Sequence, residues 1–123
     1  MADTVFSEVL GQRMRLTKWT AQREGTLRGF ADIELMTEGL RIYGCPVHVA
    51  ANGRAWAGLP GRPQIDRDGR LITQDGKAQY TRIFEWNTRE LGNGFSDAVI
   101  ELVGAQHPDA IAPDSVEAAV SPE

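Results

Sequence analysis

The sequence predicts an α+β domain: an antiparallel β-meander of four to five strands, followed by one amphipathic C-terminal helix packed on the sheet. In the N-terminal half, apolar and polar residues alternate with period two, which is typical of half-buried strands. After residue 90 the apolar period lengthens to that of a helix. A chain of 123 residues is long enough for one core. Strands followed by a helix therefore favour a single domain in which the helix covers one sheet face.

The first two strands are expected over residues 13–21 and 27–36, joined by a turn over residues 22–26 that is centred on Gly25. In the second strand two residue sets alternate, one smaller and mostly apolar and the other larger and mostly polar. The first set is Leu27, Gly29, Ala31, Ile33 and Leu35, and the second is Arg28, Phe30, Asp32, Glu34 and Met36. In the first strand, the same alternation separates Met14 and Leu16 from Arg13, Arg15 and Trp19. Such alternation indicates half-buried antiparallel strands.

A third strand is expected over residues 40–50 after a tight turn at Gly39. It contains Gly44 and Pro46, and proline cannot donate to a strand ladder, so this strand is bulged, broken or at an edge there. Asn52-Gly53 is a strong two-residue hairpin signal. Residues 54–57 then return as the fourth strand.

The middle of the chain, residues 60–77, is rich in Pro, Gly and Asp-Gly pairs and is expected to be a long loop. It includes a candidate small hairpin between residues 71–72 and 78–80. Residues 80–86 can form one further short strand. A loop of this length inside a small domain is usually functional or mobile.

The helix is indicated by one apolar stripe at helical spacing: Leu91, Phe95, Ala98, Val99, Leu102 and Val103. Asn87 followed by Glu90 resembles a capping box. Glycines at 92 and 94 weaken the first turn, so Ser96 is a second candidate cap. His107-Pro108 ends the helix.

Three regions follow from these patterns: a flexible arm over residues 1–12, a single domain over 13–107, and an acidic disordered tail over 108–123. The net charge of −4 hides an asymmetry. Residues 13–89 hold all 13 basic residues and 8 acidic ones, whereas residues 90–123 hold 7 acidic residues and no basic one. Such a division can mark a basic binding face beside an acidic tail, or it can be a chance partition of the surface.

Catalytic and metal chemistry are disfavoured. Cys45, His48 and His107 are the only soft metal ligands, fewer than the four of a structural zinc site, and residues 45 and 48 point to opposite faces of a strand. Asp32 and Glu34 share a strand face, where ion pairing is the ordinary role. Phosphate-loop and hydrolase motifs are absent from the sequence. The sequence therefore predicts no catalytic residue, no cofactor and no metal, with an enzyme using Cys45 or the Asp32/Glu34 pair as a minor alternative.

A cytoplasmic location is the expectation. No run approaches the roughly 18 apolar residues of a membrane span. The first residues are acidic, without the basic and apolar regions of a signal peptide. A single cysteine forms no internal disulfide framework.

The remaining pattern pairs basic and aromatic residues along the strands: Arg28 with Phe30, Arg41 with Tyr43, and Arg54 with Trp56. If the strand registers agree, one sheet face interleaves guanidinium groups and rings, which suits phosphates and bases of a nucleic acid. In the alternative, the rings form the core under the helix and the arginines lie at strand ends.

Several runs resemble the SpoVG septation-regulator family across residues 12–104. They are LRGFADIEL at 27–35, LRI at 40–42, GRAWAGLPGR at 53–62 and FSDAVI at 95–100. In that family the loop after the fourth strand carries basic residues implicated in DNA contact. Pro60 matches the family's proline and Arg62 its lysine, whereas Gly61 replaces a serine and Pro63 stands where a second basic residue would be.

The resemblance implies a bacterial, homodimeric DNA-binding protein that acts in transcription regulation and septation. The expected phosphate contacts are Arg62, Arg54 and Arg67, with Arg13, Arg15 and Arg28 as a secondary surface. Whether the DNA is duplex or single-stranded stays open. The alternatives are a PC4-like single-stranded DNA-binding protein, which shares only the topology, and a non-catalytic interaction module whose acidic C-terminal region binds a basic protein.

Overall fold

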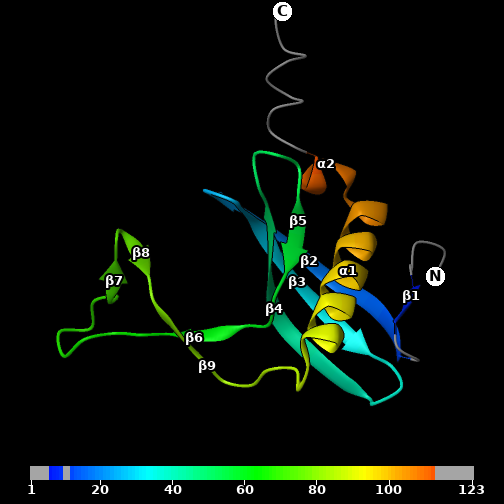
Figure 1. Ribbon diagram of the computed structural model, residues 1–123, viewed down its shortest axis with the longest axis horizontal. Helices are drawn as coiled ribbons and strands as arrows, with labels where there is room; N and C mark the ends of the chain where they lie inside the picture. The colour runs from blue at the N-terminus through cyan, green and yellow to red at the C-terminus, as the bar shows by residue number, and fades with distance from the viewer. Residues whose placement is uncertain (1–5, 10–11, 113–123) are drawn as a thin grey trace, which may run out of the picture.

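The computed structural model describes residues 6–9 and 12–112. It contains a five-stranded antiparallel sheet whose strand order follows the chain: β1 (Phe6–Val9), β2 (Gln12–Glu24), β3 (Leu27–Leu35), β4 (Leu40–Val49) and β5 (Ala55–Ala57). Helix α1 (Arg89–Gln106) crosses one face of this sheet (Figure 1). The predicted fold class, a β-meander covered by a C-terminal helix, is confirmed.

The core lies between the sheet and α1. The sheet contributes Met14, Leu16, Ala31, Ile33, Leu35, Ile42, Cys45, Val47 and Ala57, and the helix contributes Phe95, Ala98, Val99, Leu102 and Val103. The strand alternation and the helical stripe read from the sequence therefore meet in one apolar layer. Among the described residues, none of the helices is both long and apolar enough to cross a membrane.

The turns at Gly25 and Gly53 lie where the sequence predicted them, and the turn at Gly25 is shorter than expected. Gly25 and Gly53 adopt positive φ angles of 62° and 90°, and the Asn52 side chain accepts a hydrogen bond from the Arg54 N–H at 2.9 Å. Strand β2, however, runs on to Glu24, through residues expected to lie in the turn. The register between β2 and β3 shifts between Ala21 and Glu24. This irregularity takes up the extra residues and leaves only a tight turn.

The irregularity expected near Gly44–Pro46 is a β-bulge. Between the pairs Ala31–Cys45 and Ile33–Ile42, two residues of β4 face the single residue Asp32. Gly44 has a φ of 75°, and its N–H donates to the Asp32 carboxylate at 2.9 Å. A left-handed glycine and a nearby acceptor fix the bulge in place.

Residues 60–84 form paired strands rather than the expected long loop; this segment is called the ribbon below. It begins as one two-stranded pair and divides further out into two hairpins, one closed by the bridge between Ile65 and Leu71 and one close to the small hairpin that the sequence predicted. Strand β6 (Gly61–Pro63) pairs with β9 (Tyr80–Arg82), and β7 (Thr73–Gln74) pairs with β8 (Lys77–Ala78) further out. Backbone hydrogen bonds between Gln64 and Gln79 and between Ile72 and Gln64 continue the pairing between them. The ribbon extends away from the sheet and the helix (Figure 1).

The ends of the domain also differ from expectation. Residues 6–9, inside the expected flexible arm, form β1 because the outer edge of β2 offers unpaired backbone groups. Thr88, rather than Asn87 or Ser96, caps α1, and its hydroxyl accepts from the Leu91 N–H at 3.1 Å. The helix ends at His107 as predicted, but Pro108–Ile111 form a short helix, α2, inside the expected tail. Residues 113–123 of that tail lie outside the described residues.

Candidate nucleic-acid interface

The ribbon carries four exposed cations: Arg62 on β6, Arg67 and Arg70 in the turn that follows, and Lys77 on β8. Within residues 6–9 and 12–112, none of these four side chains forms an ion pair or a hydrogen bond. The Asp66 carboxylate in the same turn accepts instead from the backbone N–H groups of Asp68 and Arg70, at 2.9 and 3.0 Å. The four charges are therefore available to an anionic partner.

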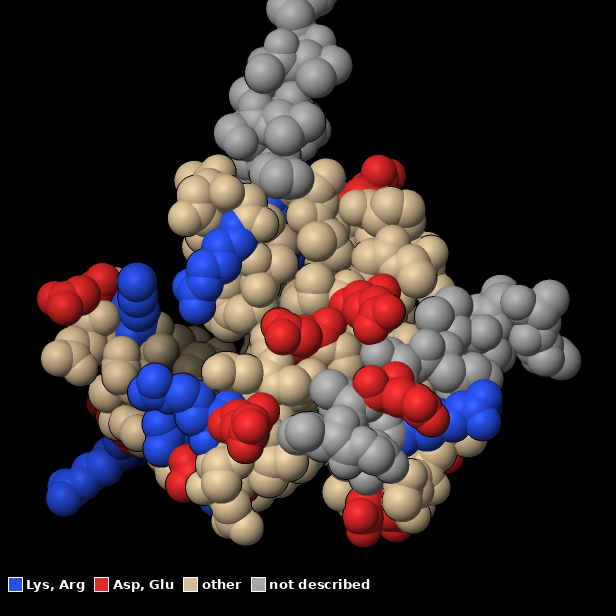
Figure 2. Space-filling model, turned by 45° about the vertical axis from the view of Figure 1, so that its right-hand side comes forward, with Lys and Arg blue, Asp and Glu red and all other residues tan. Residues whose placement is uncertain are grey.

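Charge is segregated in space as well as along the chain. The ribbon holds five basic residues against three acidic ones, whereas the span of α1 and α2 holds one basic residue, Arg89, against four acidic ones. In Figure 2, Lys and Arg side chains gather on the left of the molecule, and Asp and Glu side chains predominate at its centre. A basic region of this kind attracts polyanions, and the acidic helix face directs them toward it.

The sheet face turned away from α1, here the outer face, carries a stack of aromatic and basic side chains. The rings of His48 and Trp56 stack at 5.2 Å with 10° between their planes, and the Arg54 guanidinium lies 5.0 Å from the Trp56 ring centre. His48 also shares a hydrogen bond of 3.0 Å with the Thr26 hydroxyl. Partial burial lowers the pKa of His48, which favours the neutral form of the imidazole. Arg54 thus lies beside rings, as the sequence predicted.

The interleaving of rings and cations is only partly formed. Phe30 and Trp56 lie on the outer face, but Trp19 packs against the core, with its ring 6.0 Å from that of His107. The register between β2 and β3 shifts between Leu16 and Lys18, so the alternation that grouped Trp19 with Arg15 is broken between them.

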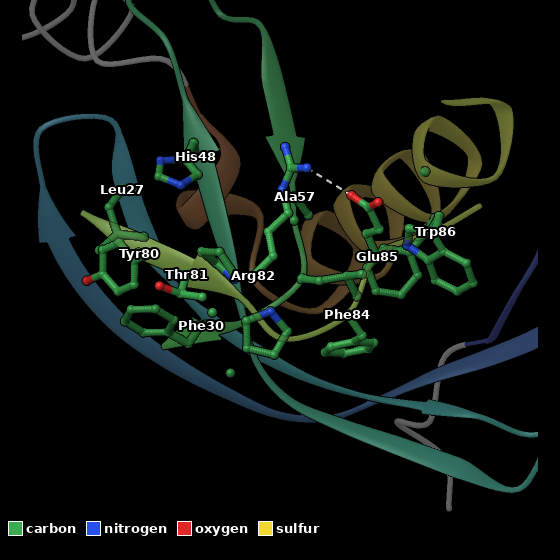
Figure 3. Close-up of a pocket in the computed structure, with 18 residues that line it drawn as sticks. Leu27, Phe30, His48, Ala57, Tyr80, Thr81, Arg82, Phe84, Glu85 and Trp86 are labelled. Carbon is green, nitrogen blue, oxygen red and sulfur yellow. Dashed lines mark hydrogen bonds and ion pairs between the residues drawn. The ribbon is translucent and has the colours of Figure 1, made fainter. Parts of the chain in front are cut away.

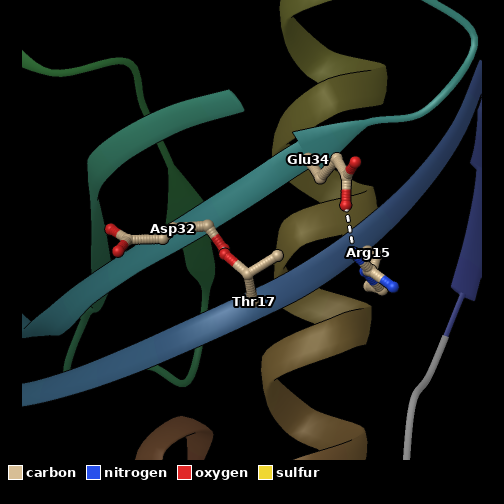
Figure 4. A network of polar contacts seen from close by, with 4 residues as sticks. All are labelled: Arg15, Thr17, Asp32 and Glu34. Carbon is tan, nitrogen blue, oxygen red and sulfur yellow. Dashed lines mark hydrogen bonds and ion pairs between the residues drawn. The ribbon is translucent and has the colours of Figure 1, made fainter. Parts of the chain in front are cut away.

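The secondary surface of Arg13, Arg15 and Arg28 is not assembled as expected. Arg15 forms an ion pair with Glu34 on the outer face (Figure 4), while Arg13 is exposed near the start of β2. Arg28 is only 2% exposed, and its Nη1 donates to the carbonyl oxygens of Ala110 and Ala112, at 2.9 and 2.7 Å. A register shift at this position, between Leu27 and Gly29, accompanies the turn of the side chain toward α2. Arg28 is therefore removed from the proposed interface.

The two carboxylates considered for acid–base chemistry have structural partners. Glu34 pairs with Arg15, and Asp32 holds the bulge at Gly44, while the Thr17 hydroxyl donates to the Asp32 carbonyl at 3.1 Å (Figure 4). Among the described residues, no three His, Cys, Asp or Glu side chains gather as a metal site. On the outer face, Glu34 therefore forms an ion pair and Asp32 holds the β-bulge in place.

The single thiol is buried, and we expect it to be unreactive in the native protein. Cys45 has no exposed surface. Burial, and to a smaller extent the nearby Asp32 charge, raises its pKa to about 12.

At pH 8 an ordinary thiol is partly thiolate, so reaction of Cys45 with Ellman's reagent is expected to be more than about a hundredfold slower in native protein than in urea-unfolded protein. Because the folded pKa is raised, the thiol's contribution to stability is lost as the pH rises above about 8.5. Equal rates in the two states would contradict this burial.

An aromatic pocket lies where the ribbon joins the domain. Its volume is about 720 Å³, and its walls come from β3, β4, the ribbon and the start of α1. Figure 3 shows Phe30, His48 and Tyr80 at one end and Phe84, Glu85 and Trp86 at the other. Sequence reasoning missed this site, although the aromatic spacing in YTRIFEW at residues 80–86 was a usable signal.

The ribbon also exposes an unusual number of large apolar side chains. Six of the nine large hydrophobic residues exposed among the described residues lie in it: Ile65, Leu71, Ile72, Tyr80, Ile83 and Phe84. Apolar side chains gathered on one projecting element are typical of a surface that meets a partner.

Comparisons of this chain with protein-family models, with curated proteins and with solved structures found no match. Its function is therefore inferred from the residues described above.

Proposed function

We propose that this protein is a cytoplasmic, non-catalytic regulator that binds DNA through its ribbon. The observation that carries the proposal is the set of four cations on the projecting ribbon, which have no side-chain partner within residues 6–9 and 12–112. An antiparallel ribbon fits the major groove of a duplex, and arginine and lysine side chains neutralise phosphates along it. Arg62 and Arg67 lie in this set, and Arg54 extends the basic surface onto the outer face.

We further propose that the protein acts as a homodimer. The exposed apolar side chains of the ribbon that lie outside the aromatic pocket support this, since a second copy of the chain would cover them: Ile65, Leu71, Ile72 and Ile83. Two-fold symmetric dimers are the commonest assemblies of soluble chains, and a dimer presents two ribbons to one DNA molecule. Sedimentation equilibrium of the full chain tests the assembly independently of DNA.

The DNA proposal predicts that removing three ribbon cations weakens binding. In the variant Arg62→Gln/Arg67→Gln/Arg70→Gln, affinity for a labelled duplex at 50 mM salt is expected to fall at least tenfold. The slope of log affinity against log salt concentration is expected to become shallower by about two to three, because each lost phosphate contact removes about 0.7–0.9 from it. Fluorescence anisotropy across a salt series measures both quantities.

The matched control removes three exposed cations outside the ribbon: Lys18→Gln/Arg41→Gln/Arg89→Gln. This variant has the same net charge as the ribbon variant, so a general charge effect would weaken both equally. We expect its affinity to stay within twofold of the unmodified protein. If micromolar unmodified protein retards neither a duplex nor a single strand at 50 mM salt, the DNA proposal is wrong.

A further inference from the structure

The aromatic pocket at the base of the ribbon is lined by rings from separate elements. Phe30 comes from β3 and His48 from β4, while Tyr80 and Phe84 come from the ribbon. Tyr80 and Phe84 remain 59% and 42% exposed. A pocket of about 720 Å³ is within the range that holds a flat organic ligand. Rings brought from three parts of the chain thus surround a space of ligand size.

The polar groups around the pocket are few, and several already have partners. The His48 Nδ1 shares its hydrogen bond with Thr26, and the Thr81 hydroxyl accepts from the Gln64 amide at 3.1 Å. Arg82 and Glu85 form an ion pair of 2.9 Å that is exposed at the pocket. The pocket walls therefore offer mainly apolar ring surface. Ring surfaces stack on any base, because every nucleobase presents a π face.

The ribbon cations begin at the edge of this pocket. Gly61 and Thr81 both line it, and Arg62 lies next to Gly61 and directly across the ribbon from Thr81. Cations that begin beside exposed aromatic side chains match the arrangement by which proteins hold single-stranded nucleic acid. A base paired within a duplex is stacked on its neighbours and cannot enter such a pocket without leaving the helix.

We propose that this pocket takes an unstacked nucleobase of single-stranded nucleic acid, whose phosphates then follow the ribbon cations. This inference rests on the proposed DNA-binding function and adds to it a separate site for unpaired bases. The ring faces of Tyr80 and Phe84 stack on the base. Arg62 contacts an adjoining phosphate.

The test compares single-stranded and duplex probes with the variant Tyr80→Ala/Phe84→Ala. The probes are a labelled oligo-deoxythymidine, the same strand paired in a duplex, and the same strand with its bases removed over its central positions. The unmodified protein is expected to bind the single strand at least tenfold more tightly than the abasic strand. The variant is expected to lose at least tenfold affinity for the single strand, while its affinity for the duplex stays within twofold.

The control variant Met36→Ala/Leu40→Ala removes two exposed apolar side chains that lie outside the ribbon and do not line the pocket. We expect it to bind all three probes as the unmodified protein does. The pocket proposal is overturned, with DNA binding intact, if the duplex is bound and Tyr80→Ala/Phe84→Ala leaves single-strand affinity unchanged. It is also overturned if that variant loses both probes equally and changes the sedimentation of the protein, since the rings then belong to a subunit contact. Binding of no probe by the unmodified protein instead overturns the DNA-binding function itself.

Discussion

Gly29→Ala is expected to lower the free energy of unfolding by about 3 kcal/mol, the upper part of the range for overpacking a core. A Cβ atom placed on Gly29 would lie 2.4 Å from the Thr20 carbonyl oxygen and 2.6 Å from the Trp19 ring. The carbonyl belongs to β2, whose pairing with β3 on both sides of this point holds the backbone in place. The ring is held by its packing on the core. Displacing either the Thr20 carbonyl or the Trp19 ring would therefore cost free energy.

Urea unfolding followed by circular dichroism measures this loss. The matched control is Gly104→Ala, the same chemical change inside α1, where the new Cβ would meet only the Ile111 side chain at 3.7 Å. Because alanine is favoured over glycine in a helix interior, this control is expected to gain up to about 1 kcal/mol. Opposite signs for the two substitutions would support close packing at Gly29. A Gly29→Ala protein as stable as the unmodified one would show that β2 and Trp19 yield easily.

The same close contact shows where sequence periodicity succeeds and where it fails. Alternation placed Gly29 correctly on the face of Ala31 and Ile33, because β3 alternates regularly from there to its end. It placed Trp19 wrongly, because a bulge after Leu16 moves the following residues of β2 to the other face. A bulge has no period of its own, so a pattern of period two cannot reveal one. At Gly44 a bulge could be predicted because glycine and proline marked it.

The ribbon shows a second limit of sequence reasoning. Its turn signals were read correctly, since Asp75 and Gly76 both adopt positive φ, at 55° and 78°, as a tight hairpin turn requires. The pairing of Gly61–Pro63 with Tyr80–Arg82 was not predicted. These strands are three residues long and 17 residues apart, so neither carries a recognisable alternation. Pairing of this kind depends on tertiary structure rather than on local pattern.

Part of the candidate site could be predicted from the sequence, and part could not. The family resemblance pointed to Arg62, Arg54 and Arg67 as phosphate contacts, and the structure leaves all three on the surface. Local pattern could single out Tyr80 and Phe84 but could not place them against Phe30 and His48, because these residues meet only through the return of the ribbon to the domain. Arg28 was misplaced because a charged residue in a strand is normally solvent-exposed, and only the position of α2 provides a buried alternative.

Arg28→Ala is expected to lower the free energy of unfolding by about 3 kcal/mol, because it leaves the buried Ala110 carbonyl and the partly buried Ala112 carbonyl without their donor and opens a cavity. The guanidinium connects β3 to the end of α2 through two hydrogen bonds, to Ala110 and Ala112. A second variant, Arg28→Met, restores volume without the donors. The difference between its unfolding midpoint and that of Arg28→Ala separates packing from hydrogen bonding. Arg41→Ala, an exposed arginine on the neighbouring strand, is the control and is expected to change stability by less than about 0.5 kcal/mol.

DNA binding by the folded Arg28→Ala protein distinguishes a structural role from an interface role. Because Arg28 is buried on the side of α2, its removal is expected to leave DNA affinity within twofold at a temperature where the variant is fully folded. The ribbon triple variant should show the reverse, with lost affinity and nearly unchanged stability, since its three arginines are exposed and unpaired within the described residues. If Arg28→Ala instead kept its stability and lost DNA affinity, the guanidinium would have to leave α2 and reach the surface when DNA binds. The helix end would then be a part of the molecule that moves on binding.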